Sequence, residues 1–161
     1  MALSSSPLSH LHIYIYVYDT TKDMWQLLAS PCNNGALAVY RDQLVVAGGT
    51  LGYSNVTGKV WVLDEKEHEW TEGIPPMPTA RCDAVAMGVD EYLTVLGGSC
   101  EDVSSFSGSI NVVEIYDGHQ WMKTDPLPVS CSNLWSVCIP QWLLFHNGWC
   151  GPTQHRLLCF I

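Results

Sequence analysis

The chain has 161 residues, of which 47% are apolar and 14% charged, and its formal net charge is −9 at pH 7. This composition suits one folded domain and is too apolar for a disordered chain. Because the seven Lys and Arg residues form no basic stripe, we expect neither nucleic acid nor an anionic membrane as a partner.

The N-terminal part of the chain predicts a short leader followed by two strands. Residues 1–12 include the serine-rich "MALSSSPLS" and carry no strand pattern. The runs "IYIYVYD" from Ile13 and "MWQLL" from Met24 are rich in strand-forming residues, and they form a half unit over 13–28.

Two complete units of four short strands follow. The first, over 36–73, contains "ALAVY", "LVVAGG", "KVWVLD" and "EWTEG". The second, over 83–124, contains "DAVAMGV", "YLTVLGG", "NVVEIYD" and "QWMKT". An incomplete and degraded unit over 135–161 contains "WSVCIP", "WLLFHNG" and "HRLLCFI". No segment has the period of an amphipathic helix, so we predict an all-β chain.

Three landmarks recur in the same order in these units. A glycine pair ends the second strand, an aspartate ends the third strand, and a tryptophan lies on the fourth. These residues are Gly48, Gly49, Gly97 and Gly98; Asp19, Asp64 and Asp117; and Trp25, Trp70 and Trp121. A period of about 50 residues made of strands is typical of a propeller.

The landmark residues have structural explanations. Glycine pairs allow positive φ and a close approach of the neighbouring aromatic side chains. Each aspartate can accept hydrogen bonds from backbone N–H groups two or three residues later and so fix the turn between the third and fourth strands. The alternative of a metal site is disfavoured because the three aspartates fall one per unit and far apart.

The landmarks, together with "PPMPTAR" between units, resemble the kelch repeat. The resemblance covers about Ile13 to Ile161 and implies a partial β-propeller of about three four-stranded blades, either an open arc or part of an oligomeric ring. In the last unit, His146, Asn147 and a single glycine replace the glycine pair. The family implies that loops between strands form binding surfaces, most often for proteins.

The number of blades leaves the assembly open, because a closed propeller needs about four to eight. The favoured interpretation is a fragment or truncated product of a longer kelch protein. The alternative is a six-bladed ring of two copies, in which the strand near Trp25 completes the last blade of the other copy. The strand with Tyr14, Tyr16 and Tyr18 is an exposed edge that predicts self-association.

Candidate ligand-binding residues lie in the connections after the second and fourth strands. They are Tyr53, Asn55, Arg81, Asp102, Phe106, Asn133 and Trp149. This mixture of aromatic, cationic and small polar residues suits protein recognition, although each could also be an ordinary loop residue. Arg81 could pair with an acidic ligand group. Gly35 and Cys131 at the neighbouring positions leave no arginine ring, which disfavours a highly acidic peptide.

Catalytic motifs are missing from the sequence, and we predict no catalytic residue, metal or cofactor. His146, Cys150 and His155 could form a soft-metal site but lack a fourth ligand. The seven cysteines are an odd number without a C-x-x-C pair, which indicates reduced thiols. The N-terminus lacks a signal-peptide pattern, so the expected location is the cytoplasm.

The predicted function is a non-enzymatic kelch scaffold for protein–protein interaction, with target recognition as in ubiquitin-ligase adaptors as its more specific form. No BTB segment is present in this sequence. Two alternatives stay open: a metal-dependent enzyme with a site on the propeller axis, and a fragment without independent activity.

Overall fold

The computed structural model describes residues 14–52, 55–100 and 108–132, together with the backbone of three strands at 136–139, 142–145 and 148–150. Every regular element in these ranges is a β-strand, and among them there is no helix that could cross a membrane. The prediction of an all-β fold is confirmed. The predicted leader and the strand expected from His155 lie outside the described residues.

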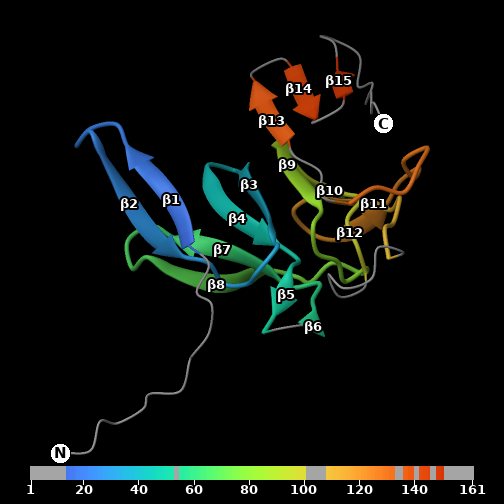
Figure 1. Cartoon of the computed structure of the whole chain (residues 1–161), viewed down its shortest axis with the longest axis horizontal. Coiled ribbons are helices and arrows are strands. Elements are labelled where there is room, and N and C mark those ends of the chain that lie inside the picture. The colour runs from blue at the N-terminus through green and yellow to red at the C-terminus, as the bar shows by residue number, and fades with distance from the viewer. Residues whose placement is uncertain are drawn as a thin grey trace, which may run out of the picture.

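The strands form small antiparallel sheets that follow one another along the chain (Figure 1). The half-blade contains β1 (Tyr14–Asp19) and β2 (Met24–Ala29). Blade A has the order β3-β4-β7-β8 and comprises β3 (Ala36–Tyr40), β4 (Gln43–Ala47), β7 (Val60–Asp64) and β8 (Glu69–Ile74). A hairpin of β5 (Thr50–Leu51) and β6 (Asn55–Val56) lies in the connection from β4 to β7.

Blade B repeats the strand order of blade A. It comprises β9 (Val85–Val89), β10 (Tyr92–Leu96), β11 (Val113–Tyr116) and β12 (Trp121–Lys123). A further sheet of three strands contains β13 (Ser136–Ile139), β14 (Trp142–Phe145) and β15 (Gly148–Cys150). The half-blade and blade B lie on opposite sides of blade A (Figure 1).

The inner hairpin of blade A is set by a two-residue turn. Tyr40 pairs with Gln43, and both intervening residues, Arg41 and Asp42, have positive φ values of 49° and 60°. Such turns match the twist of the strands that they join. The short connection therefore places β4 directly beside β3, and these are the first two strands predicted for this unit.

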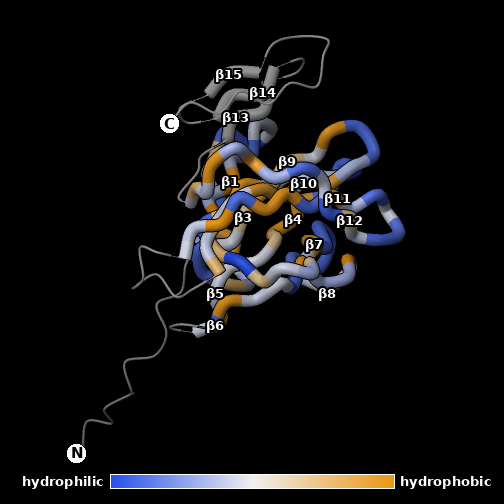
Figure 2. Tube along the Cα trace, turned by 90° about the vertical axis from the view of Figure 1, so that its right-hand side faces the viewer, coloured by the Kyte–Doolittle hydropathy of each residue, from blue (hydrophilic) through white to orange (hydrophobic). Residues whose placement is uncertain are grey.

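The main hydrophobic core lies between the two complete blades. Alternate residues of β3, namely Ala36, Ala38 and Tyr40, are buried in one cluster with Leu93 and Val95 of β10. Hydrophobic residues gather along these inner strands in the middle of the molecule (Figure 2). The blades therefore stack face to face, and burial of these side chains stabilises the stack.

Each tryptophan of a complete blade connects that blade to the sheet before it. The indole Nε1–H of Trp70 donates to the carbonyl of Ala29 at 2.7 Å, and that of Trp121 donates to the carbonyl of Pro75 at 2.7 Å. The recurring tryptophan thus belongs to the fourth strand of its own blade and also forms a hydrogen bond to the preceding sheet.

Replacement of Trp121 by phenylalanine should therefore weaken the junction between blades A and B. The variant keeps an aromatic ring but leaves the Pro75 carbonyl without its indole donor. We expect a loss of about 1 kcal/mol in the free energy of unfolding, measured by urea denaturation. Trp25→Phe is the matched control and should change stability less, because the Trp25 side chain is exposed.

The three recurring aspartates lie at the turns between the third and fourth strands. Asp117 Oδ1 accepts hydrogen bonds from the backbone N–H groups of His119 and Gln120, both at 2.8 Å. Asp19 and Asp64 accept from the residues two and three positions later in the same way. The hydrogen bonds from Gln120 and His119 lower the pKa of Asp117.

The Asp117 turn should contribute to stability in a pH-dependent way. Because its pKa is lower in the folded state, the contribution is present above the ordinary carboxyl value of 3.8 and is lost as pH falls through the folded value. We expect Asp117→Ala to be less stable than the unmodified chain near neutral pH, with a gap that narrows below about pH 4. Urea denaturation at several pH values measures this gap. A gap that stays constant would contradict the prediction.

Candidate protein-binding site

The connections after the second and fourth strands converge at one end of the blades. In blade A, the backbone N–H of Met77 donates to the Gly58 carbonyl at 2.7 Å, and that of Arg81 donates to the Thr57 carbonyl at 3.3 Å. The Gly49 N–H in turn donates to the Arg81 carbonyl at 2.8 Å. These main-chain bonds join the two kinds of connection into a continuous surface, which we call the loop face.

The hairpin of β5 and β6 is anchored to the loop face by the segment before β3. The backbone groups of Asn33 and Thr50 exchange hydrogen bonds of 3.0 and 2.7 Å, and Asn33 Nδ2 donates to the Gly52 carbonyl at 3.3 Å. Asn55 is exposed on β6 of this hairpin. The hairpin therefore presents a polar, ordered edge to solvent.

Asn34 and Asp83 join the two blades on the same face. They occupy equivalent positions, two residues before the first strand of each blade, and both have positive φ values, 54° and 52°. Asn34 Nδ2 donates to Asp83 Oδ1 at 2.7 Å, and the Asp83 N–H donates to the Asn34 carbonyl at 3.0 Å. This polar pair extends the surface next to the hairpin.

The glycine pairs allow the connections to approach one another. All four glycines have positive φ, from 62° at Gly97 to 106° at Gly49. A Cβ at Gly48 would lie 2.3 Å from the Arg81 carbonyl oxygen, and one at Gly98 would lie 2.6 Å from the Cys82 carbonyl oxygen. The neighbours at these two positions are thus backbone carbonyls, which corrects the expectation that aromatic rings lie closest.

Arg81 is not available to a ligand on this face, contrary to the sequence-based expectation. Its side chain is fully buried, and Nη2 lies 2.6 Å from Glu114 Oε2. Nη1 donates to the carbonyls of Gly97 and Val112 at 3.1 and 2.9 Å, and Nε donates to the Thr79 carbonyl at 3.3 Å. Burial lowers the Arg81 pKa, an effect that the charge of Glu114 opposes. Arg81 therefore serves the interior beneath the loop face.

The positional counterpart of Arg81 in blade A is Cys32, and not Gly35 as expected from the sequence. Arg81 and Cys32 each donate to the first glycine of the following pair, with Cys32 Sγ lying 3.2 Å from the Gly48 carbonyl. Trp61 packs with Cys32 at the strand position that Glu114 occupies in blade B. Burial raises the pKa of the Cys32 thiol to about 12. One blade thus has an apolar pair where the other has an ion pair.

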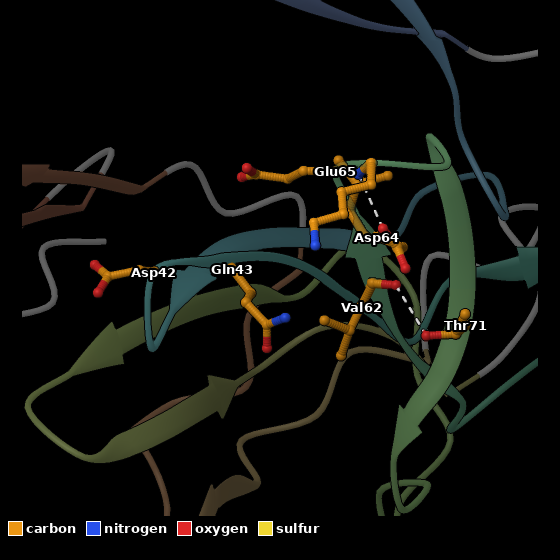
Figure 3. Close-up of a pocket in the computed structure, with 8 residues that line it drawn as sticks. Asp42, Gln43, Val62, Asp64, Glu65 and Thr71 are labelled. Atoms are coloured by element: carbon orange, nitrogen blue, oxygen red, sulfur yellow. Dashed lines mark hydrogen bonds between the residues drawn. The ribbon is translucent and has the colours of Figure 1, made fainter.

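A polar cavity of about 400 Å³ lies at the opposite end of blade A. It is lined by Asp42 in the turn from β3 to β4, by Asp64 at the end of β7 and by Glu65 after it (Figure 3). Asp64 Oδ1 accepts from the Lys66 N–H at 2.9 Å and so is engaged in its own turn. Because this end of blade A lies opposite the loop face, a substitution here can serve as the control for a substitution on the loop face.

The structure describes only part of the predicted ligand-binding set. Asn55 is exposed on the loop face and Arg81 is buried. Tyr53, Asp102, Phe106 and Asn133 lie outside the described residues, and for Trp149 only the backbone is described. Asn34 and Asp83 were not among the predicted residues, although they occupy the same position in the two units, two residues before the first strand. Asn133 is their counterpart in the third unit.

Metal ligands do not gather within the described ranges. No group of three His, Cys, Asp or Glu side chains there could hold a metal ion. The site considered at His146, Cys150 and His155 falls on side chains outside those ranges. The loop face instead offers backbone groups and short polar side chains held by hydrogen bonds, which is chemistry for recognition.

Comparison with known families agrees with this architecture. The family model described as the kelch motif matches residues 31–78, which include all of blade A. The chain carries a kelch motif. Proteins with kelch repeats are generally protein-interaction scaffolds, and the match confirms the predicted resemblance of this chain to the kelch repeat.

Two curated kelch proteins are similar to this chain. Kelch-like protein 40 of Xenopus tropicalis is 32% identical over 107 residues, which are 61% of this chain and 17% of that protein. A putative F-box/kelch-repeat protein of Arabidopsis thaliana is 35% identical over 75 residues, which are 47% of this chain and 19% of that protein. The chain therefore matches less than a fifth of the length of either relative.

Proposed function

We propose that this kelch chain is a non-enzymatic scaffold that binds a protein partner through the loop face. The observation that carries the proposal is the network of main-chain bonds that joins the connections around Asn33, Thr57 and Arg81. Such a network fixes the surface before a partner arrives, which lowers the entropic cost of binding. Exposed Asn55 and the pair of Asn34 and Asp83 supply adaptable polar contacts on that surface.

The specific role that we propose is target recognition in a ubiquitin-ligase adaptor. The proposal is supported by the names of the two relatives, a kelch-like protein and an F-box/kelch-repeat protein. In such a role, the kelch blades would hold the target. We also propose a cytoplasmic location, which the free thiol of the buried Cys32 supports.

The test compares capture of partners by variants on opposite ends of blade A. The full chain is immobilised, captured proteins are identified by mass spectrometry, and direct binding of each is then measured by calorimetry. We expect Asn55→Arg to weaken a genuine partner at least ~10-fold, because a long charged side chain would obstruct the loop face. Glu65→Arg, in the turn after β7, is the matched control and should bind as the unmodified chain does. Equal binding by both variants would contradict the proposal.

A further inference from the structure

The junction between the two complete blades contains an Asn-Gly dipeptide. Asn34 lies two residues before β3 and is followed directly by Gly35. The Asn34 side chain reaches blade B, where Nδ2 donates to Asp83 Oδ1 at 2.7 Å. Glycine has no Cβ to shield its backbone nitrogen, so this nitrogen can approach the preceding side-chain amide more easily than that of any other residue. A chemically reactive amide thus forms a contact between the blades.

Packing requires a glycine at position 35. A Cβ there would lie 2.6 Å from Val46 Cγ1 and 2.7 Å from Cys32 Sγ, and both neighbouring side chains are buried. A bulkier residue would hinder the attack on Asn34 but would not fit without moving these neighbours. At the equivalent position of blade B, Ala84 follows Asp83, and an aspartate has no amide to lose. The fold therefore keeps the reactive dipeptide in blade A.

The backbone nitrogen of Gly35 is held only weakly. Its N–H donates to the Cys32 sulfur, and sulfur is a weak acceptor. None of the backbone hydrogen bonds described for the connections uses this N–H group. Within the part of the chain that the structure describes, freeing the nitrogen therefore breaks no strong hydrogen bond.

We propose that Asn34 is a site of spontaneous deamidation. The backbone nitrogen of Gly35 loses its proton and forms a bond to Cγ of Asn34, while the bond from Cγ to Nδ2 breaks and ammonia leaves. Water then opens the resulting cyclic imide at one of its two carbonyls. The net reaction consumes one water, releases one ammonia and leaves either aspartate or isoaspartate at position 34.

The aspartate product breaks the polar pair between the blades. An oxygen replaces Nδ2, so two carboxylates meet where a donor now lies 2.7 Å from an acceptor. Like charges at this distance repel one another. Asp83 takes part in none of the ion pairs of the described residues, so no cation there offsets the repulsion. The blades then keep only the main-chain bond from Asp83 to the Asn34 carbonyl at this point.

The isoaspartate product also disturbs that main-chain bond. The chain then runs through the former side chain of Asn34, and the Asn34 carbonyl that accepts the Asp83 N–H at 3.0 Å becomes part of a free carboxylate. The backbone also gains one CH2 group before Gly35, which Val46 and Cys32 enclose tightly. Both products therefore loosen the junction in one direction only, and neither effect requires a partner on the loop face.

The first experiment follows the reaction in the folded full chain. The protein is incubated at mildly alkaline pH, where the backbone nitrogen loses its proton more readily, and its peptides are analysed by mass spectrometry over time. We expect Asn34 to lose its amide while Asn55 keeps its own. Asn55 is the internal control, because it is exposed on the same face but is followed by Val56, whose branched side chain hinders the attack. An Asn34 amide that persists as long as that of Asn55 would overturn the proposal.

The second experiment tests the effect on the junction with variants that imitate the aspartate product. We expect Asn34→Asp to lower the thermal midpoint by about 2–4 °C, the shift that loss of one hydrogen bond produces in a chain of this size. Asn55→Asp adds the same charge away from Asp83 and should leave the midpoint unchanged.

The double variant Asn34→Asp, Asp83→Asn exchanges the donor and the acceptor of the pair. It should regain the midpoint of the unmodified chain, because the amide at position 83 can donate to the carboxylate at position 34. Two results would contradict the role assigned to the pair: an Asn34→Asp variant as stable as the unmodified chain, or a double variant no more stable than Asn34→Asp alone.

Discussion

Replacement of Arg81 by methionine should cost about 3–5 kcal/mol in the free energy of unfolding, the largest loss expected for any single side chain described here. In the variant, the Glu114 carboxylate stays buried beside Thr79 but loses the Arg81 guanidinium that lies 2.6 Å from it in the unmodified chain. It also removes the donors to the carbonyls of Gly97 and Val112. Chemical denaturation and the thermal midpoint both measure the loss.

The other blade provides the compensating variant. Because blade A has Cys32 and Trp61 at the positions of Arg81 and Glu114, the double variant Arg81→Cys, Glu114→Trp places the same apolar pair in blade B. We expect it to be at least ~2 kcal/mol more stable than Arg81→Met, since a buried ion pair can be replaced by apolar residues but not halved. A double variant as unstable as the single one would show that Arg81 acts mainly through its backbone acceptors.

Features that recur in every unit were predicted correctly from the sequence. The strand runs, the glycine pairs and the turn aspartates recur in order, so one unit supports the assignment of the next. Arg81 was misjudged because it differs between units: Cys32, Arg81 and Cys131 share one position, and their roles depend on the strand residue opposite. Only the fold brings Glu114 beside Arg81, and no local pattern indicates that pairing.

The candidate surfaces were predictable to different degrees. The convergence of the connections on one face followed from the resemblance to kelch propellers, and the exposed tyrosines of β1 followed from their period of two. The cavity of about 680 Å³ on blade B did not follow, since its lining residues Met87, Ile115 and Met122 come from three strands and are apolar whether buried or exposed. Their exposure depends on which sheet covers blade B, which is a property of the stack.

Replacement of Gly49 by alanine should cost about 3 kcal/mol or more. The residue has a φ of 106°, where a side chain is strained, and the added Cβ would lie 2.5 Å from the Asn33 carbonyl oxygen and 2.6 Å from Cys32 Sγ. The Asn33 backbone is held by its hydrogen bonds to Thr50, so it cannot move aside without loss of those bonds. Urea denaturation measures the change in unfolding free energy.

Gly52 separates the two causes of that loss. It also has positive φ, 69°, but a Cβ built there meets nothing within 4 Å. Gly52→Ala should therefore cost only the conformational strain of about 1–2 kcal/mol. If Gly49→Ala were no more harmful than Gly52→Ala, the glycine pair would supply backbone freedom alone. A clearly larger loss at Gly49 would mean that the pair is required because two connections of the loop face pass too close for any side chain.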